Sequence, residues 1–198
     1  MLNAIVAADT WLFRLINGLA GHNRLLDALM KACANDYGIF VCMCGALLAL
    51  WFGIMDPARR LNIQKGVLAA LASLGLSNAA VRISNIFLFR SRPYAVLSNV
   101  HLLFYRPTVS SFPSAPAATL FSIAAAVYLA DSKVGRWFFL AAVLEGFARV
   151  YVGVHYPLDI LAGAALGGAV ALGVTKLFRS LDPLFNWLLG FIRRLYLA

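Results

Sequence analysis

Residues 148–159 read Ala-Arg-Val-Tyr-Val-Gly-Val-His-Tyr-Pro-Leu-Asp, a stretch that places Arg149, His155 and Asp159 in a strongly apolar part of the chain. An ionisable residue at the centre of a bilayer costs about 2.5 to 3.5 kcal/mol, so three of them this close together indicate a functional site. Pro157 predicts the start of a helix, because proline fits a first helical turn and restricts the residues before it. Asp159 then lies in that first turn, within reach of a His155 ring nitrogen.

The chain is far more apolar than a soluble domain. Hydrophobic residues make up 62% of its 198 residues and charged residues 13%, whereas soluble domains average about 45–50% and 25%. This length is enough for one domain with five or six membrane spans and short loops. We therefore expect residues 1–198 to form a single membrane-embedded domain, an all-α bundle of about five to six transmembrane helices.

Hydrophobic patterning predicts where these helices lie. Residues 3–20 are amphipathic, because Asp9 and Arg14 interrupt an apolar segment, and residues 24–34 form a second short helix. Amphipathic segments of this kind lie in the membrane interface, so the two predict an N-terminal interfacial helical hairpin. Transmembrane spans are expected at residues 37–55, 66–89, 114–130, 137–153 and 157–178. Close helix approach is expected at four glycines of the last span: Gly163, Gly167, Gly168 and Gly173.

Positive charge is unevenly placed along the chain and predicts its orientation. A helix break at residues 56–60 and a turn near residues 131–136 carry Lys and Arg, as cytoplasmic segments of membrane proteins do. The net charge of +9 is attributed to this orientation and not to nucleic-acid binding, since the basic residues form no stripe. The loop at residues 90–113 and the His155 region then face the periplasm or the exterior of the inner (plasma) membrane. The cytoplasmic set comprises Arg59, Arg60, Lys65, Lys133, Arg136, Lys176, Arg179, Arg193 and Arg194.

Three partial motifs resemble, in order, those of the type-2 phosphatidic acid phosphatase superfamily of membrane phosphatases. Arg149, five residues, His155, three residues and Asp159 resemble its third signature. Arg92-Pro93 resembles the end of the first signature, and Phe112-Pro113-Ser114 the start of the second. The features most similar to undecaprenyl pyrophosphate phosphatases of the bacitracin-resistance type are Asn17-Gly18, His22-Asn23 and Ser111-Phe112-Pro113-Ser114.

The resemblance implies roles for the polar residues of these motifs. His155 would attack phosphorus and form a phosphohistidine, and Asp159 would raise its nucleophilicity. Elementary chemistry agrees, because a neutral imidazole held by a carboxylate is a competent nucleophile near neutral pH. Arg92 and Arg149 carry planar guanidinium groups suited to phosphate oxygens. Ser114 would bind a phosphate oxygen through its hydroxyl and its backbone amide at the start of a helix.

Two positions depart from the family pattern. Where the family has a lysine seven residues before Arg92, this chain has Asn85, and Arg82 one helical turn earlier is expected to supply the missing charge. Arg82 and Asn85 are therefore included among the phosphate-binding candidates. The family's Pro-Ser-Gly-His, or Pro-Ser-Asp-His, is here Pro113-Ser114-Ala115-Pro116, so its general-acid histidine is absent. Arg90, close to the first motif, is expected to be a solvated loop charge or a lipid headgroup contact.

Three functions stay open. The preferred one is hydrolysis of an isoprenoid diphosphate, similar to undecaprenyl pyrophosphate, to the monophosphate through a phosphohistidine. The alternatives are a lipid monophosphate phosphatase or phosphotransferase, and a degenerate relative that binds or transports lipid phosphates without chemistry. No metal or other cofactor is expected, because the sequence lacks the carboxylate cluster of a magnesium site. The expected partners are the lipid phosphate substrate and the bilayer.

Overall fold

The computed structural model describes residues 2–194 and, within them, the side chains at all positions except 2, 58, 193 and 194. This part of the chain forms α-helices joined by loops and turns, with no strand. The all-α prediction is therefore confirmed for the described residues. The helices are α1 (Leu2–Asn17), α2 (Arg24–Ala34), α3 (Gly38–Phe52), α4 (Pro57–Phe87), α5 (Pro93–Val96), α6 (Ala115–Ala130), α7 (Ser132–Tyr151), α8 (Pro157–Ser180) and α9 (Asp182–Arg194).

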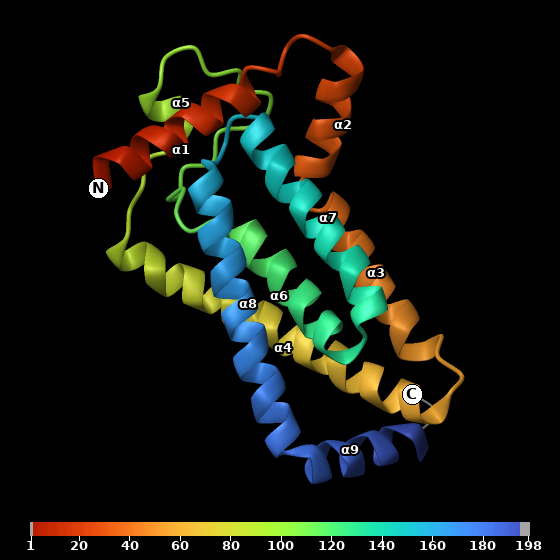
Figure 1. Cartoon of the computed structure of the whole chain (residues 1–198). Helices are drawn as coiled ribbons and strands as arrows, with labels where there is room; N and C mark the ends of the chain where they lie inside the picture. Colours follow the sequence, from red (N-terminus) through yellow and green to blue (C-terminus); the bar gives the residue numbers. More distant parts are fainter. Residues whose placement is uncertain (1, 195–198) are drawn as a thin grey trace.

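The centre of the bundle is α6 (Figure 1). It packs against α4, α7 and α8, and its buried side chains join those of α3, α4, α7 and α8 in one apolar cluster. The α6 members of this cluster include Leu120, Ile123, Ala124 and Val127. Both α1 and the short α5 lie at one end of the bundle, and α9 lies across the opposite end.

Two glycines of α8 allow α6 and α8 to approach closely. An added Cβ on Gly163 would lie 2.5 Å from the carbonyl oxygen of Ser114, the N-cap of α6, and one on Gly167 would lie 2.2 Å from that of Ala118 in α6. Side chains cannot come this near to a backbone, so only glycine permits the contact. The prediction of close approach is wrong for Gly168 and Gly173, where an added Cβ would meet no atom within 4 Å.

Fewer helices than predicted are both long and apolar enough to cross a membrane. In the described residues two segments qualify, Arg59–Phe87 and Pro157–Ser180, and a third is added if α2 and α3, bent by 52° at their junction, form one span. The apolar α6 has 16 residues, which at about 1.5 Å per residue cover about 24 Å of a roughly 30 Å hydrocarbon core. The longer α7 carries charges, among them Glu145 and Arg149. The predicted five to six spans are therefore not confirmed.

Two helices begin earlier than predicted because of capping residues. Residues 56–60, predicted as a break, are the start of α4, which has proline in its first turn and Asp56 accepting from the Arg59 amide at 2.7 Å. Similarly, α7 begins at Ser132 and not at residue 137, because the Asp131 carboxylate accepts from two amides of the first turn. Proline and N-cap aspartates both favour a helix start.

Asn17 joins three segments that are far apart in the sequence. Its side-chain nitrogen donates to the carbonyl oxygens of His101 at 2.9 Å and Tyr151 at 2.8 Å, and its side-chain oxygen accepts from the His101 amide at 2.9 Å. Gly153 turns the chain after α7 with a φ of +89°, and a Cβ there would meet the His101 carbonyl oxygen at 3.0 Å. Helix α1, the loop before α6 and the α7–α8 turn are thereby held together.

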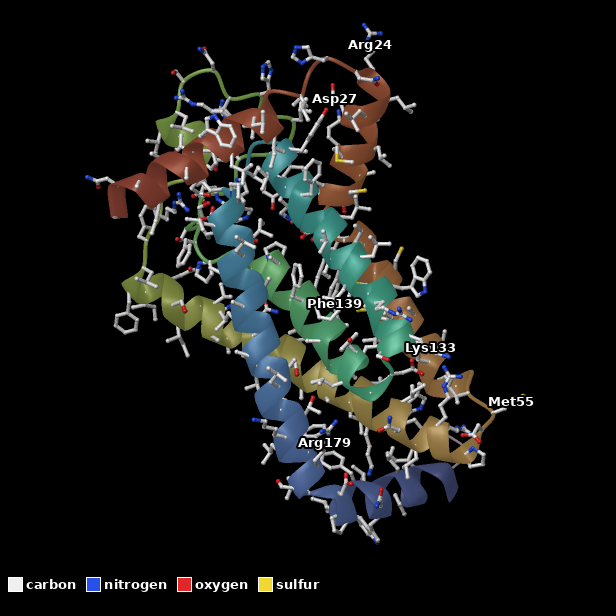
Figure 2. All side chains as sticks on the ribbon, in the orientation of Figure 1. Arg24, Asp27, Met55, Lys133, Phe139 and Arg179 are labelled. Atoms are coloured by element: carbon white, nitrogen blue, oxygen red, sulfur yellow. The ribbon has the colours of Figure 1, made fainter. Side chains whose placement is uncertain are left out.

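Charged residues mark both ends of the bundle (Figure 2). Lys133 and Arg179 lie toward the same end as Met55, and Arg24 and Asp27 lie at the opposite end. Two residues of the predicted cytoplasmic set thus share one end, as the predicted orientation requires, and the direction in which that end faces stays a prediction. The side chains of Arg193 and Arg194, in the same set, lie outside the described ones.

Candidate active site

His155 lies in the turn between α7 and α8 and is 2% exposed. Its Nδ1 lies 3.0 Å from the Ser111 carbonyl oxygen and 3.5 Å from Asp159 Oδ2. Its Nε2 lies 3.2 Å from Arg92 Nη1. Because Nδ1 faces two acceptors, we assign the ring proton to Nδ1, which leaves the lone pair on Nε2.

The surroundings keep the His155 ring neutral near pH 7. Burial lowers its pKa to about 4, and the charges of Arg92 and Arg149 act in the same direction, while the hydrogen bond to Asp159 opposes them. The neutral imidazole is the form that can act as a nucleophile.

Asp159, in the first turn of α8, is fully buried and accepts several hydrogen bonds. Its Oδ2 accepts from the Ser111 hydroxyl at 2.5 Å and the Tyr156 amide at 2.8 Å, and its Oδ1 accepts from Arg90 Nη1 at 2.7 Å. These donors hold the carboxylate next to His155 Nδ1. The structure therefore places Asp159 where the sequence predicts it, and its catalytic role stays a prediction.

Arg90 is not the solvated charge or headgroup contact that was predicted. Besides Asp159, it donates from Nη2 to Asp9 Oδ2 at 2.6 Å, and its guanidinium lies 4.0 Å from the centre of the Tyr156 ring. Asp9 accepts in addition from the Leu158 amide at 2.9 Å. Because Asp9 belongs to α1 and Leu158 to α8, this network ties the N-terminal helix to the active-site turn.

Arg92 is buried and held by backbone carbonyl groups. Its Nε donates to Val109 at 3.0 Å, its Nη1 to Val154 at 2.9 Å and its Nη2 to Ser110 at 3.4 Å. The same Nη1 faces His155 Nε2. A phosphate bound at this point would meet a cation that is already oriented.

Arg149, near the end of α7, is buried and paired with two carboxyl groups. Its Nε donates to Glu145 Oε1 one helical turn earlier, and its Nη2 donates to Asp36 Oδ1 at 2.8 Å. Asp36, in the loop between α2 and α3, also accepts from the Tyr105 hydroxyl at 2.7 Å. The predicted phosphate ligand Arg149 is therefore paired in this structure.

The other predicted phosphate ligands differ in placement. The Ser114 amide donates to the carbonyl of Asp159 at 3.0 Å, and the Ser114 hydroxyl oxygen accepts from the Ala117 amide at 3.4 Å as the N-cap of α6. The amide is thus engaged, and the hydroxyl proton remains for a ligand. Arg82 is exposed on α4, and Asn85 follows on the same helix with a buried side-chain oxygen that has no hydrogen-bond partner among the described residues. Within residues 2–194 no hydrogen bond joins either side chain to the histidine.

Several residues of the site had no predicted role. Asp9 and Glu145 carried a signal, because each is an acidic side chain within an otherwise apolar helical segment. Ser111 belonged to a motif of the family resemblance but was given no role, and Asp36 lies in a loop where nothing in the local sequence distinguishes it. Their positions in the site follow only from contacts with residues that are distant along the chain.

Comparison with known proteins identifies the family. Residues 66–182, more than half of the chain, match the PAP2 superfamily. The chain belongs to the PAP2 superfamily. This PAP2 protein is 29% identical to undecaprenyl-diphosphatase BcrC of Bacillus subtilis, over 94% of this chain and 91% of that protein. The resemblance inferred from the three motifs is therefore confirmed.

Two solved structures are similar to this chain. LpxE of Aquifex aeolicus is similar with a TM-score of 0.67 and 29% identity, over 84% of this chain and 94% of that chain. The transmembrane PAP2-type phosphatidylglycerolphosphate phosphatase of Bacillus subtilis has a TM-score of 0.61 and 21% identity, over 90% and 88% of the two chains, a likeness of fold alone. Because this protein belongs to the PAP2 superfamily and has apolar helices, it is a membrane lipid phosphatase.

Proposed function

We propose that this PAP2 protein hydrolyses an isoprenoid diphosphate, of the undecaprenyl diphosphate class, to the monophosphate through a phosphohistidine on His155. The observation that carries the proposal is the setting of the ring, with Asp159 at 3.5 Å from Nδ1 and Arg92 at 3.2 Å from Nε2. The similarity to BcrC over most of both chains supports the substrate class.

The proposed reaction has two displacements. In the first, His155 Nε2 forms a bond to the terminal phosphorus, and the bond from that phosphorus to the bridging oxygen breaks. In the second, water forms a bond to phosphorus and the N–P bond breaks, which releases inorganic phosphate. Arg92 and Arg149 offset the charge of the phosphoryl oxygens, and for this Arg149 exchanges its Asp36 partner for the phosphate.

Pro116 favours a diphosphate over a monophosphate. The residue cannot supply a proton, and a positioned acid is typically worth about 10² to 10⁴-fold in rate. A monophosphate ester releases an alkoxide, which needs that proton. A diphosphate releases a phosphate group whose pKa is about 6, so its departure depends much less on an acid.

The proposed location is the inner (plasma) membrane, with several spans and the site facing the periplasm or the exterior. Lys133 and Arg179, of the predicted cytoplasmic set, lie at the same end of the bundle (Figure 2). Helix α1, which contributes Asp9 to the site, lies at the other end of the bundle (Figure 1). The positive-inside rule then supports an outward site.

Phosphate release from isoprenyl diphosphate and monophosphate in detergent tests the proposal. Wild type is expected to release phosphate from the diphosphate and much less from the monophosphate, and His155→Ala to release none. His22→Ala is the matched control, because His22 is exposed and is expected to keep activity. A wild-type protein that binds these lipids without turnover would replace the enzyme proposal with the non-catalytic alternative.

A further inference from the structure

A cavity of about 290 Å³ lies beside the start of α6. Two backbone hydrogen bonds link segments of its wall to the segments that carry His155 and Asp159. Ser114, just before the first residue of α6, donates its amide to the Asp159 carbonyl at 3.0 Å, and Val154, just before His155, donates its amide to a carbonyl of α7, that of Arg149, at 3.2 Å. The cavity walls include Asp36, Ala115, Pro116, Thr119, Glu145 and Arg149.

Glu145 is a buried carboxyl group in this wall for which the two displacements above have no use. It is 2% exposed, and its Oε1 accepts from Arg149 Nε, whereas no donor among the described residues contacts Oε2. Arg149 also pairs with Asp36, so one guanidinium serves two carboxyl groups. A buried carboxyl group without a full counter-charge is favoured in its neutral, proton-bearing form.

Three other polar side chains of the wall, those of Asp36, Arg149 and Thr119, are already engaged. Asp36 uses Oδ1 for Arg149 and Oδ2 for the Tyr105 hydroxyl. Arg149 cannot be deprotonated in a protein. Thr119 donates to a carbonyl of α6 and accepts from Asn78. Glu145 therefore offers the one carboxyl oxygen of this cavity wall that is free to exchange a proton with a ligand.

We propose that Glu145 is the proton-transfer residue of this chain and acts, from the cavity beside Pro116, on the leaving oxygen and on the attacking water. The inference rests on the proposed function above. Pro116 stands where the superfamily resemblance calls for a histidine, and Glu145 reaches the same cavity from α7.

The proton balance is complete over the two displacements. As His155 Nε2 bonds to phosphorus, the electron pair of the breaking P–O bond stays on the bridging oxygen, which takes the proton of Glu145. As water then bonds to phosphorus, the electron pair of the breaking N–P bond returns to Nε2, and the Glu145 carboxylate takes a proton from the water. The sum is one diphosphate and one water giving one monophosphate and one inorganic phosphate.

The test follows Glu145→Gln with a diphosphate radiolabelled at its terminal phosphate. Glutamine keeps an oxygen for Arg149 but cannot exchange a proton, so substrate binding should change little. We expect steady-state turnover to fall by about 10² to 10⁴-fold, with labelled phosphoenzyme accumulating on His155 and KM changing far less than kcat. Monophosphate turnover, already low in wild type because no acid stands at position 116, should fall further and without accumulation, because the first step then fails.

Two variants make the result decisive. Thr119→Val removes a hydroxyl from the same cavity and should accumulate no phosphoenzyme. The turnover of Glu145→Asp should lie between that of Glu145→Gln and that of wild type. If Glu145→Gln does not fold, Glu145→Asp replaces it as the test. Suppose that Glu145→Gln, or Glu145→Asp in its place, turns over diphosphate at the wild-type rate and without phosphoenzyme. That result would overturn the role of Glu145 and leave the proposed function intact. Absence of diphosphate turnover in wild type would overturn the proposed function, and this inference with it.

Discussion

The two sides of the His155 ring differ in charge. On the Nδ1 side, Asp159 is already neutralised by Arg90, which it shares with Asp9. On the Nε2 side, Arg92 is held by carbonyl groups and forms no ion pair within the described residues. The carboxylate behind the ring is therefore compensated, whereas the cation in front of it stays available for an anion. This asymmetry favours a phosphate at Nε2.

The reactivity of His155 should persist at unusually low pH. Its pKa falls from an ordinary 6.5 to about 4, so the ring stays neutral as the pH drops through 6.5 and becomes protonated near 4. In a His22→Ala/His101→Ala background, which leaves His155 as the sole histidine, inactivation by diethyl pyrocarbonate should keep its rate from pH 7 to about 5. A midpoint near 6.5 would contradict the buried setting.

The lowered pKa of His155 also makes the stability of the folded protein depend on pH. The unfolded chain protonates this histidine near 6.5 and the folded chain near 4. The contribution of the neutral ring to stability is thus fully present above pH 6.5 and is lost as the pH falls toward 4.

Asp9→Asn should destabilise the protein by leaving Arg90 without one partner. Breaking a buried pair costs about 3–5 kcal/mol, but the Arg90 side chain is 25% exposed and keeps Asp159, so we expect about 1–3 kcal/mol. Thermal unfolding in detergent measures the change. Asp182→Asn is the control, because the Asp182 side chain is 49% exposed whereas that of Asp9 is fully buried, so the loss of its pair with Lys65 should cost about 0–1 kcal/mol. Equal losses in the two variants would argue against the network.

At the scale of elements, the site depends on the contact between α6 and α8. Ser114 is the N-cap of α6 and Asp159 lies in the first turn of α8, and the amide of the first bonds to the backbone carbonyl of the second at 3.0 Å. Gly163 and Gly167 of α8 keep the two helices close beyond this hydrogen bond. A change in helix spacing would therefore move the carboxylate relative to the Ser114 cap.

Gly167→Ala should push α6 and α8 apart. The new Cβ would lie 2.2 Å from a carbonyl oxygen of α6, and overpacking of this kind costs about 1–3 kcal/mol. Gly168→Ala meets no atom within 4 Å and should stabilise α8 by up to about 1 kcal/mol through helix propensity. Thermal unfolding together with phosphate release compares the neighbours, and a loss at both positions would contradict the packing described.

The local sequence predicted where helices start at the active site, but it did not predict the ion pairs between residues that are far apart in the chain. Pro157 opens α8 and Ser114 caps α6 as expected, because proline and N-cap residues act within one turn. Arg90 was misjudged because its partners lie 69 and 81 positions away, and the pairing of Arg149 depends on Asp36, 113 positions away. Residue spacing along the chain holds no information on such pairs.

At the scale of the whole molecule, orientation can be tested with cysteines placed at the two ends of the bundle. After replacement of Cys33, Cys42 and Cys44, the exposed positions 98 and 133 are changed in separate variants, Ser98→Cys and Lys133→Cys. A membrane-impermeant maleimide should label the first in intact cells and the second only after permeabilisation. The reverse pattern would place the site at the cytoplasmic face.

The hydrogen bond from Leu158 to Asp9 spans 149 positions of the chain, and this separation sets an order of events during synthesis. At about 5–20 residues per second, about 7–30 s pass between the emergence of the first residue and that of the second. Until Leu158 emerges, Asp9 of the N-terminal helix can have Arg90 as a partner but lacks its bond to α8. An amphipathic segment can stay at the membrane surface for that time, so we expect the enzyme to become active only after α8 has been inserted.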